Sequence, residues 1–564
     1  MRNIQEIYQR WLVQTTENRE LHDELISIQN DTAAIEDRFY RDLEFGTGGL
    51  RGVLGAGSNR MNIYTVARAT QGYCNYLRKH FDIPMVAIAY DSRIHSDLFA
   101  QTAAGVFAAN RIMVHLYPKL MPTPALSFAV RDFHCNGGIV ITASHNPSKY
   151  NGYKVYGADG CQITTEAAEE IQQEIDMIDP FTQVASMTFE EAIQCDMVSY
   201  IGIDAVRRYL SAVSKTSILP NNVSRDVSIV YTPLNGTGIS CVPQCLERNG
   251  FTNIVIPDEQ KKPDGNFPTC PYPNPEVKEA LTVGLDWAKR TESDLLLATD
   301  PDCDRVGAAI RSNDEYVLIT GNEMGVLLLD FICKMRLEHN TMPHDPVAVK
   351  TIVTTPMAAK IAAHYGVQLI DVLTGFKFIG EQIGLLEQKG ETDRYIFGFE
   401  ESYGYLSGSF VRDKDAVNAS LLICELFAYY KAQDKSLLDV LMELYQQYGF
   451  YESRLLSFAF EGASGFAKMQ AFMEDLRKNS PRELAGYTVE KVIDYQTDAT
   501  GLPKSNVLRF FLNGGGEAVI RPSGTEPKLK VYLTAIGTSR NEVKCATVQL
   551  SDWFYQMMKD KGAP

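Results

Sequence analysis

Short apolar runs separated by helical patterns are the feature that most limits what this chain can fold into. Three such runs stand near the N-terminal end, at Val86–Tyr90, Ile112–Leu116 and Gly138–Thr142. Each is followed by a polar loop, and a helical pattern at Asp97–Ala109 separates the first two. Strands that alternate with helices predict buried, partly parallel sheets. The first part of the chain is therefore expected to be an α/β unit.

The same alternation begins again further along the chain. Apolar runs recur at Val227–Tyr231, Val347–Val353 and Tyr395–Phe399. The longest apolar stretch, Met324–Met335, contains Asp330 and a lysine, and it is too short to cross a bilayer. We expect this stretch to be a buried helix and the surrounding segments to form further α/β units.

The C-terminal part follows a different pattern. After Ser453 come one apolar strand and two helical patterns, and the tail then reads as antiparallel strands with turns at Asn513–Gly516 and Pro522–Pro527. A chain of 564 residues is too long for one hydrophobic core. We predict three α/β domains with mixed sheets and a smaller C-terminal α+β domain, covering residues 1–205, 206–318, 319–445 and 446–564.

Composition and charge exclude several classes of protein. The net charge of −16 argues against a nucleic-acid partner, which requires a basic face. The N-terminal residues MRNIQEIYQRWLVQ lack the apolar core of a signal peptide, so we expect neither secretion nor membrane insertion. The eleven cysteines are odd in number, and the closest pair, Cys241 and Cys245, has no CxxC spacing. Reduced thiols in a cytoplasmic protein are the simplest interpretation.

An acidic motif, Asp300-Pro301-Asp302-Cys303-Asp304-Arg305, directly follows the apolar run Asp294–Ala298. If the motif is extended, alternate side chains share a face and the three carboxylates converge. Converging anions are unfavourable unless a cation binds, and oxygen ligands suit Mg²⁺. A calcium EF-hand would need Gly and Glu where Arg305 and Arg311 stand. A solvated acidic turn is the alternative, and the spacing favours a metal site.

Three other loops carry candidate chemistry. Ser144 follows an apolar strand in Thr-Ala-Ser-His-Asn-Pro, where a sheet can hold it outward, although a capping turn is the alternative. The Gly-x-Ser-x-Gly frame of a serine hydrolase is absent. The loop 521–528 offers an arginine fork, hydroxyls and a glycine amide to a phosphate, or is a polar hairpin turn. Gly398–Gly404 has adjacent carboxylates and a hydroxyl that suit sugar hydroxyls, or is an acidic strand end.

The glycine-rich segment Gly46–Gly52 does not indicate a nucleotide site. It fails the dinucleotide fingerprint because Arg51 occupies the last glycine position, and no Gly-Lys-Ser/Thr follows. NAD-dependent and ATP-dependent enzymes are therefore disfavoured.

The set and order of these loops resemble a known group of proteins. TASHNP, DPDCDR, GFEESYG and RPSGTEPK occur in this order at wide spacing, as in the α-D-phosphohexomutase superfamily. The form GFEESYG resembles its phosphoglucomutase branch, including members that also act on pentose phosphates. The resemblance extends from GTGGLRG near the start to RPSGTEPK near the end. It implies four domains around a central cleft, each contributing one loop.

The resemblance also implies roles for individual residues. Ser144 would carry the phosphoryl group and, with Asp300, Asp302 and Asp304, would bind Mg²⁺. Residues expected to contact the substrate sugar and its charges are Glu400, Ser402, Lys377 and Arg305, and those expected to hold the non-reacting phosphate are Arg521, Ser523, Gly524 and Thr525. Arg51, His145 and Lys154 match positions that handle protons and charge. Either Lys154 or His145 could be the general base.

The expected reaction is the interconversion of glucose 1-phosphate and glucose 6-phosphate through a phosphoserine enzyme, with glucose 1,6-bisphosphate as intermediate and activator. Some bacterial hexomutases have His four residues after the first Glu of the sugar loop, whereas this chain has Gly404. Dual glucose and mannose specificity of that kind is therefore not expected. Phosphopentomutase and phosphomannomutase activity remain open, as do, more remotely, a Mg²⁺-dependent sugar phosphatase and a non-catalytic sensor. The sequence does not determine the oligomeric state.

Overall fold

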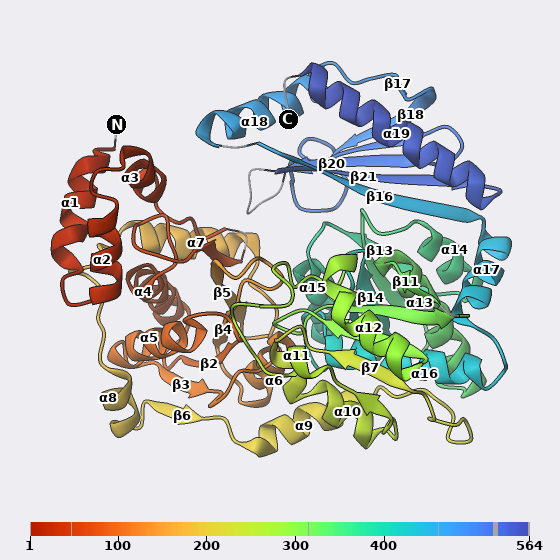
Figure 1. The fold of residues 1–564 in the computed structure, drawn as a ribbon, viewed down its shortest axis with the longest axis horizontal. Coiled ribbons are helices and arrows are strands. Elements are labelled where there is room, and N and C mark those ends of the chain that lie inside the picture. The colour runs from red at the N-terminus through yellow and green to blue at the C-terminus, as the bar shows by residue number, and fades with distance from the viewer. Residues whose placement is uncertain (1, 47, 314, 461, 523–527, 562–564) are drawn as a thin grey trace.

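A computed structural model describes residues 2–46, 48–313, 315–460, 462–522 and 528–561. Its strands form four sheets that follow one another along the chain. Figure 1 shows helices packed against the first three sheets, whereas the fourth sheet, in blue, lies above the others. Three α/β domains with mixed sheets and a C-terminal α+β domain are present, as predicted.

The first sheet has the order β1-β5-β4-β2-β3-β6, in which only β5 runs against the other strands and is antiparallel to both of its neighbours, β1 and β4. Its strands are β1 (Gly49–Val53), β2 (Met85–Tyr90), β3 (Met113–Leu116), β4 (Gly137–Ile141), β5 (Tyr150–Gly157) and β6 (Val198–Tyr200). The helices of this region are α1 (Ile4–Gln14), α2 (Arg19–Ser27), α3 (Thr32–Phe39), α4 (Ile63–His80), α5 (Ser96–Ala109), α6 (Thr123–Asp132), α7 (Thr165–Asp176), α8 (Phe189–Gln194) and α9 (Ile203–Ser214).

The second sheet has the order β11-β10-β9-β7-β8, with β9, β7 and β8 parallel. Its strands are β7 (Ile229–Thr232), β8 (Ile254–Val255), β9 (Leu295–Thr299), β10 (Val306–Ser312) and β11 (Glu315–Ile319). They accompany the helices α10 (Val242–Arg248), α11 (Asp258–Lys261) and α12 (Thr282–Thr291), and the 3₁₀ turns η1 (Thr237–Ser240) and η2 (Lys278–Leu281). Every residue of β9 is buried, which explains why the predicted strand is an uninterrupted apolar run.

The third sheet has the order β13-β12-β14-β15, and only β15 is antiparallel to its neighbour. Its strands are β12 (Val347–Thr351), β13 (Gln368–Val372), β14 (Tyr395–Glu400) and β15 (Gly404–Leu406). The helices are α13 (Gly321–Glu338), α14 (Met357–His364), α15 (Phe376–Gln388), α16 (Ala416–Lys431) and α17 (Leu437–Tyr448), with the turn η3 (Thr392–Arg394). The stretch expected to be a buried helix forms the centre of α13, which Thr320 and Glu323 start with a capping box.

The fourth sheet is wholly antiparallel, with the order β16-β21-β20-β19-β18-β17. It contains β16 (Phe450–Ala459), β17 (Glu483–Leu484), β18 (Tyr487–Asp494), β19 (Leu508–Leu512), β20 (Glu517–Pro522) and β21 (Lys528–Gly537), with α18 (Gly462–Lys478) and α19 (Arg540–Asp560). Two helical patterns were expected before β19, and this prediction is wrong for the second. That segment forms β17 and β18: the β-branched residues of β18 pair with β19, and β17 pairs with β18.

Several apolar clusters stabilise the molecule, and the first domain has a large one of its own, which includes Val66, Ile88 and Ile141. The largest apolar cluster joins α6 of the first domain to strands and helices of the second and third, including Leu297, Val349 and Leu422. The fourth domain has its own cluster, which includes Phe510 and Phe554. Within the described residues, no helix is both long and apolar enough to cross a membrane.

Candidate active site

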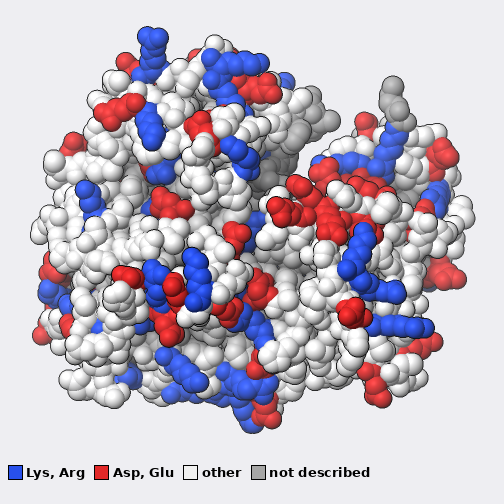
Figure 2. Space-filling model, turned by 180° about the vertical axis from the view of Figure 1, so that it is seen from behind, with Lys and Arg blue, Asp and Glu red and all other residues white. Residues whose placement is uncertain are grey.

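A cleft of about 1130 Å³ lies where the four domains meet. Its lining includes Arg51 and His145 from the first domain, Arg305 from the second, Glu400 from the third and Arg521 from the fourth. Seen from behind in Figure 2, a notch separates the N-terminal domain at the right from the domain of the fourth sheet at the upper left. Acidic and basic side chains are intermixed over this face. The predicted central cleft is confirmed.

The Ser144 loop connects β4 to β5 and lies just behind the cleft wall. Ser144 is only 3% exposed, and its φ of 51° places it in the left-handed region. Its hydroxyl donates a hydrogen bond of 2.7 Å to Asp300 Oδ2 and lies 3.1 Å from His145 Nδ1. The loop thus brings a serine of the first domain onto the acidic motif of the second.

The acidic motif is a turn and not the extended segment that we predicted. Cys303 has a φ of 54°, and Asp300 Oδ1 accepts hydrogen bonds from the backbone N–H groups of Asp304 (3.1 Å) and Arg305 (3.0 Å). The chain therefore folds back on itself after β9. The carboxylates of Asp300, Asp302 and Asp304 still converge, with ligand atoms within 4.8 Å of one another, and all three are buried. The prediction that the three carboxylates converge is therefore confirmed, although the predicted extended backbone is wrong.

Two lysines from neighbouring domains balance the charge of these aspartates. Lys154 Nζ, on β5, donates to Asp302 Oδ2 at 2.7 Å and to Asp304 Oδ2 at 3.2 Å. Lys414 Nζ lies 2.9 Å from Asp304 Oδ2. Burial opposes the charge of Lys154, but Asp302 and Asp304 outweigh burial and raise its pKa. Lys154 is therefore protonated when it contacts the aspartates.

His145 and Arg51 line the cleft beside the serine loop. Burial lowers the pKa of His145 well below its usual value, and the nearby Arg305 and Arg51 lower it further. Arg51, on β1, donates to the side-chain oxygen of Asn146 at 3.2 Å. A neutral His145 can accept a proton, while Lys154 could do so only after losing its own, so the choice of general base stays open.

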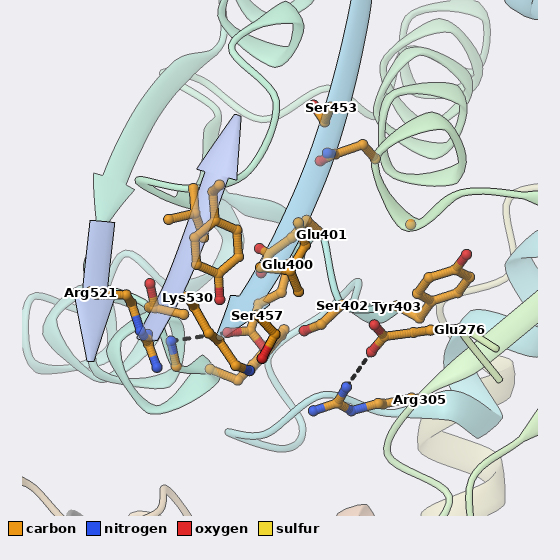
Figure 3. Close-up of a pocket in the computed structure, with 18 of the residues that line it drawn as sticks. Glu276, Arg305, Glu400, Glu401, Ser402, Tyr403, Ser453, Ser457, Arg521 and Lys530 are labelled. Carbon is orange, nitrogen blue, oxygen red and sulfur yellow. Dashed lines mark hydrogen bonds and ion pairs between the residues drawn. The ribbon is translucent and has the colours of Figure 1, made fainter. Parts of the chain in front are cut away.

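The sugar loop begins at the end of β14. Glu400 is 5% exposed, and its Oε1 accepts a hydrogen bond of 3.0 Å from the N–H of Gly375. Burial, with Glu401 adding to it, raises the pKa of Glu400 to about 7 against the opposing charges of Lys414 and Arg305. Figure 3 shows Glu400, Glu401 and Ser402 close together at the pocket.

Two basic side chains, Arg305 and Lys377, also line the cleft. Arg305 forms an ion pair of 2.5 Å with Glu276, drawn as a dashed line in Figure 3. Lys377, at the start of α15, lines the cleft, and burial lowers its pKa. Both side chains therefore line the same cleft as the sugar loop.

The fourth domain contributes basic groups at the end of β20. Arg521 is paired across the sheet with Lys530 of β21, and both line the cleft, as Figure 3 shows. The predicted phosphate contacts Ser523, Gly524 and Thr525 lie outside the described residues. The contribution of these three residues to a phosphate site therefore stays a prediction.

Models of four protein domains match this chain in the order of its sheets. They are the Phosphoglucomutase/phosphomannomutase alpha/beta/alpha domains I, II and III, at residues 42–181, 207–313 and 320–448, and the C-terminal domain at 472–544. The phosphoglucomutases of Staphylococcus haemolyticus (strain JCSC1435) and Staphylococcus aureus (strain USA300) are 36% and 37% identical over 511 and 518 residues. These alignments span 88% and 89% of this chain and 91% of each relative.

The chain belongs to the phosphoglucomutase/phosphomannomutase family.

Solved structures agree in fold. A phosphoglucomutase/phosphomannomutase family protein from Burkholderia thailandensis has a TM-score of 0.66 at 18% identity, covering 92% of this chain and 98% of its own. The open form of pp63/parafusin (phosphoglucomutase) from Paramecium also has a TM-score of 0.66, at 20% identity, covering 93% and 95%. Membership of the family makes this protein an isomerase that transfers a phosphoryl group within a sugar phosphate. The predicted family and enzyme class are confirmed.

The aspartates of this family member suit a divalent metal ion. Asp302 Oδ1 and Asp304 Oδ1 are buried and have no hydrogen-bond partner among the described residues. Buried carboxylate oxygens without a partner are unfavourable, and a hard cation bound by oxygen ligands would satisfy them. Together with the Ser144 hydroxyl, the three carboxylates provide the donor set that was predicted.

The site also contains residues that sequence reasoning missed. Lys414 follows the sugar loop in a charged run and gives no periodic signal. Thr123 donates its backbone N–H to the Asp302 carbonyl (2.8 Å) and its hydroxyl to Asp302 Oδ2 (2.9 Å). Glu276 was missed because it lies in a proline-rich loop without a recognisable motif.

Proposed function

We propose that this protein is a phosphoglucomutase, which interconverts glucose 1-phosphate and glucose 6-phosphate. The observation that carries the proposal is the hydrogen bond from the Ser144 hydroxyl to Asp300, one of three buried aspartates behind the wall of a large cleft. The relatives named phosphoglucomutase, which align over nearly nine-tenths of the chain, favour glucose as the sugar.

In the proposed reaction, phosphorylated Ser144 donates its phosphoryl group to the 6-hydroxyl of glucose 1-phosphate. The bond from phosphorus to Ser144 Oγ breaks as the bond to the sugar oxygen forms, and either His145 or Lys154 accepts the hydroxyl proton. The resulting glucose 1,6-bisphosphate turns over within the cleft. The Ser144 alkoxide left by the first transfer then attacks the phosphoryl group at position 1. The bond from phosphorus to sugar oxygen 1 breaks, the base gives its proton to that oxygen, and glucose 6-phosphate is released.

Cationic groups and a metal stabilise the charge that the transferring phosphoryl group develops. Mg²⁺, held by Asp300, Asp302 and Asp304, would neutralise charge on the oxygens of this group. Arg51 lies beside the same loop and can contribute positive charge there. The residues of the chain thus mainly position and neutralise the reactants.

The substrate would be held at both ends. Arg521 would bind the phosphate that does not react, together with Ser523, Gly524 and Thr525. Glu400 and Ser402 would form hydrogen bonds with sugar hydroxyls. Lys377 and Arg305 would contribute positive charge beside the sugar. Because one phosphate clamp serves both orientations of the bisphosphate, the sugar contacts must tolerate both.

We further propose that residues 1–205, 206–318, 319–445 and 446–564 form the four domains, since each segment corresponds to one sheet. A cytoplasmic location is proposed because the eleven cysteines are all free in the described structure.

Turnover of a panel of sugar 1-phosphates, with the matching bisphosphate as activator, tests the substrate. Glucose 1-phosphate should give the highest kcat/KM. A higher value for ribose or deoxyribose 1-phosphate would make the enzyme a phosphopentomutase, and a higher value for mannose 1-phosphate a phosphomannomutase. Conversion of none of these substrates would reject the proposed function.

A further inference from the structure

A buried arginine outside the four loops contacts the Ser144 loop at four places. The side chain of Arg93, which follows β2, has no exposed surface. Its Nη1 donates to the carbonyl oxygens of Pro147 (3.0 Å) and Tyr150 (2.9 Å). Its Nη2 donates to the carbonyl oxygens of Ser144 (2.5 Å) and Asn146. One guanidinium therefore binds the loop from its catalytic serine to the first residue of β5.

The conformation of this loop requires such support. Ser144 has a φ of 51°, which is unfavourable for a residue other than glycine and persists only where the surroundings enforce it. Inside the loop, few backbone bonds are available: the N–H of Asn146 donates to the Ala143 carbonyl, and that of Tyr150 to the Pro147 carbonyl. The planar, multiply donating guanidinium binds four carbonyls of the loop in a fixed geometry, which a lysine cannot reproduce.

Arg93 is itself held from both sides. Its Nε lies 3.4 Å from Asp91 Oδ2, and both side chains are fully buried. The ring of Phe267, from the second domain, stacks on the guanidinium, with its centre 5.1 Å from the guanidinium carbon. The same segment approaches so closely that a Cβ on Gly265 would lie 2.5 Å from the backbone nitrogen of Ile94. The domain that carries the aspartates therefore packs directly against the turn that carries Arg93.

We propose that Arg93 is a positioning residue for phosphoryl transfer, which fixes the Ser144 loop so that the serine hydroxyl meets the aspartates of the second domain. The proposal rests on the proposed function, in which Ser144 carries the phosphoryl group. The Arg93 side chain has no exposed surface and does not line the cleft; its two Nη atoms bind backbone carbonyls and its Nε faces Asp91. It acts on the alignment of the nucleophile and not on substrate affinity.

The test is Arg93→Lys in the full-length enzyme. Misalignment of reacting groups by about 1 Å can reduce rates by about 100-fold, so we expect kcat to fall about 10- to 100-fold. KM for glucose 1-phosphate should stay within about threefold, because the proposed sugar and phosphate contacts lie on other loops. The rate at which glucose 1,6-bisphosphate phosphorylates Ser144, followed by intact mass, should fall with kcat. Hydrogen exchange of residues 142–150 should become faster.

Arg60→Lys is the matched control. Arg60 is also a buried arginine that donates to backbone carbonyls, those of Asp37 and Asn59, but its contacts lie outside the serine loop. This variant should lose thermal stability without faster exchange at residues 142–150 and without the loss of kcat. A comparable loss of kcat in both variants would show that Arg93 contributes stability alone, and the proposal would be wrong.

Phe267→Leu gives a second, milder measurement if Arg93→Lys does not fold. It removes the ring from the guanidinium but leaves all four carbonyl contacts available, so a several-fold loss of kcat with unchanged KM is expected. The proposal would be overturned if Phe267→Leu, and Arg93→Lys where it folds, had the same kcat and the same hydrogen exchange at residues 142–150 as the parent enzyme. If the parent enzyme is active but never phosphorylated on Ser144, the proposed phosphoserine mechanism fails instead, while the exchange comparison still decides whether Arg93 holds the loop.

Discussion

Replacing Glu400 with Gln should reduce activity and, at alkaline pH, increase stability. Glu400 is 5% exposed and its pKa is raised to about 7, chiefly by burial. An ionised carboxylate can accept hydrogen bonds from two sugar hydroxyls, whereas the amide has only one accepting oxygen. Hydrogen bonds to a charged group contribute about 1.5–3 kcal/mol, so kcat/KM at pH 8 should fall about 10- to 150-fold.

The sign of the stability effect follows from proton linkage. A raised pKa means that, between the unfolded value near 4.5 and the folded value of about 7, the folded state binds the proton more tightly. Stability from this group is present below the unfolded pKa and is lost as the pH rises through about 7. A shift of this size corresponds to about 3 kcal/mol at pH 8. Glu400→Gln should therefore melt above the parent at pH 8, and the difference should narrow at pH 5.

The assay is the pH dependence of kcat/KM together with thermal unfolding at both pH values. The parent should lose about tenfold in kcat/KM per pH unit below about 7. The variant should retain only the inflection of the substrate phosphate, whose second pKa is about 6. Glu425→Gln is the control, because burial also raises the pKa of Glu425 to about 7 but its partners are Ser217 and Ile218, outside the cleft.

If kcat/KM of Glu400→Gln falls below about pH 7 as steeply as that of the parent enzyme, the fall does not come from protonation of Glu400 and the assignment is refuted. A lower melting temperature than the parent at pH 8 would refute the claim that burying its charge is unfavourable. If Glu425→Gln no longer shows the fall of kcat/KM at acidic pH, protonation lowers activity through the stability of the protein and not through the sugar loop.

Three further predictions concern the other loops. The parent enzyme, incubated with glucose 1,6-bisphosphate, should carry one phosphoryl group on Ser144 by peptide mass spectrometry, and Ser144→Ala should lose activity by orders of magnitude with the fold retained; a parent that is never phosphorylated would exclude a phosphoserine mechanism. Chelation should abolish activity and Mg²⁺ restore it, and Asp302→Ala should bind Mg²⁺ more weakly in calorimetry because three anionic ligands become two; equal affinity would contradict the metal site. Arg521→Ala should lose about 2–4 kcal/mol of binding to the non-reacting phosphate, a fall of roughly 30- to 1000-fold in kcat/KM, and should need more added bisphosphate because the intermediate escapes; a parental rate and bisphosphate requirement would assign Arg521 to a structural turn.

Strands and helices with strong local signals were predictable from the sequence. The apolar runs at β2, β4 and β12 were placed within two residues of their observed bounds, because a strand buried on both faces must be apolar throughout. The segment that forms β18 was assigned to a helix, because all of its residues are exposed or only partly buried and its pairing with β19 depends on a partner later in the chain. The local sequence pattern therefore predicted the strands whose structure is determined by burial, and failed for a strand determined by pairing with a distant segment.

The site could be predicted only in part, for a related reason. Ser144, the aspartates and Glu400 stand in compact motifs, each at the end of a strand, and the structure brings them to one region. Lys414 and Arg93 act through contacts with segments far away in the sequence, and a single charged residue gives no signal of such contacts. The turn at Cys303 was equally hidden, since its positive φ occurs in a residue with no preference for it.

The charges around Asp304 explain why the first three domains must assemble before the metal-binding site exists. Three buried carboxylates on one turn repel one another, and burial alone would favour their protonation. Lys154 from the first domain and Lys414 from the third lower the pKa of Asp304 against that burial, so the aspartate stays ionised. The bond between Ser144 and Asp300 likewise crosses a domain boundary. An ionised metal-binding site aligned with its serine is therefore a property of the packed domains and not of any one loop.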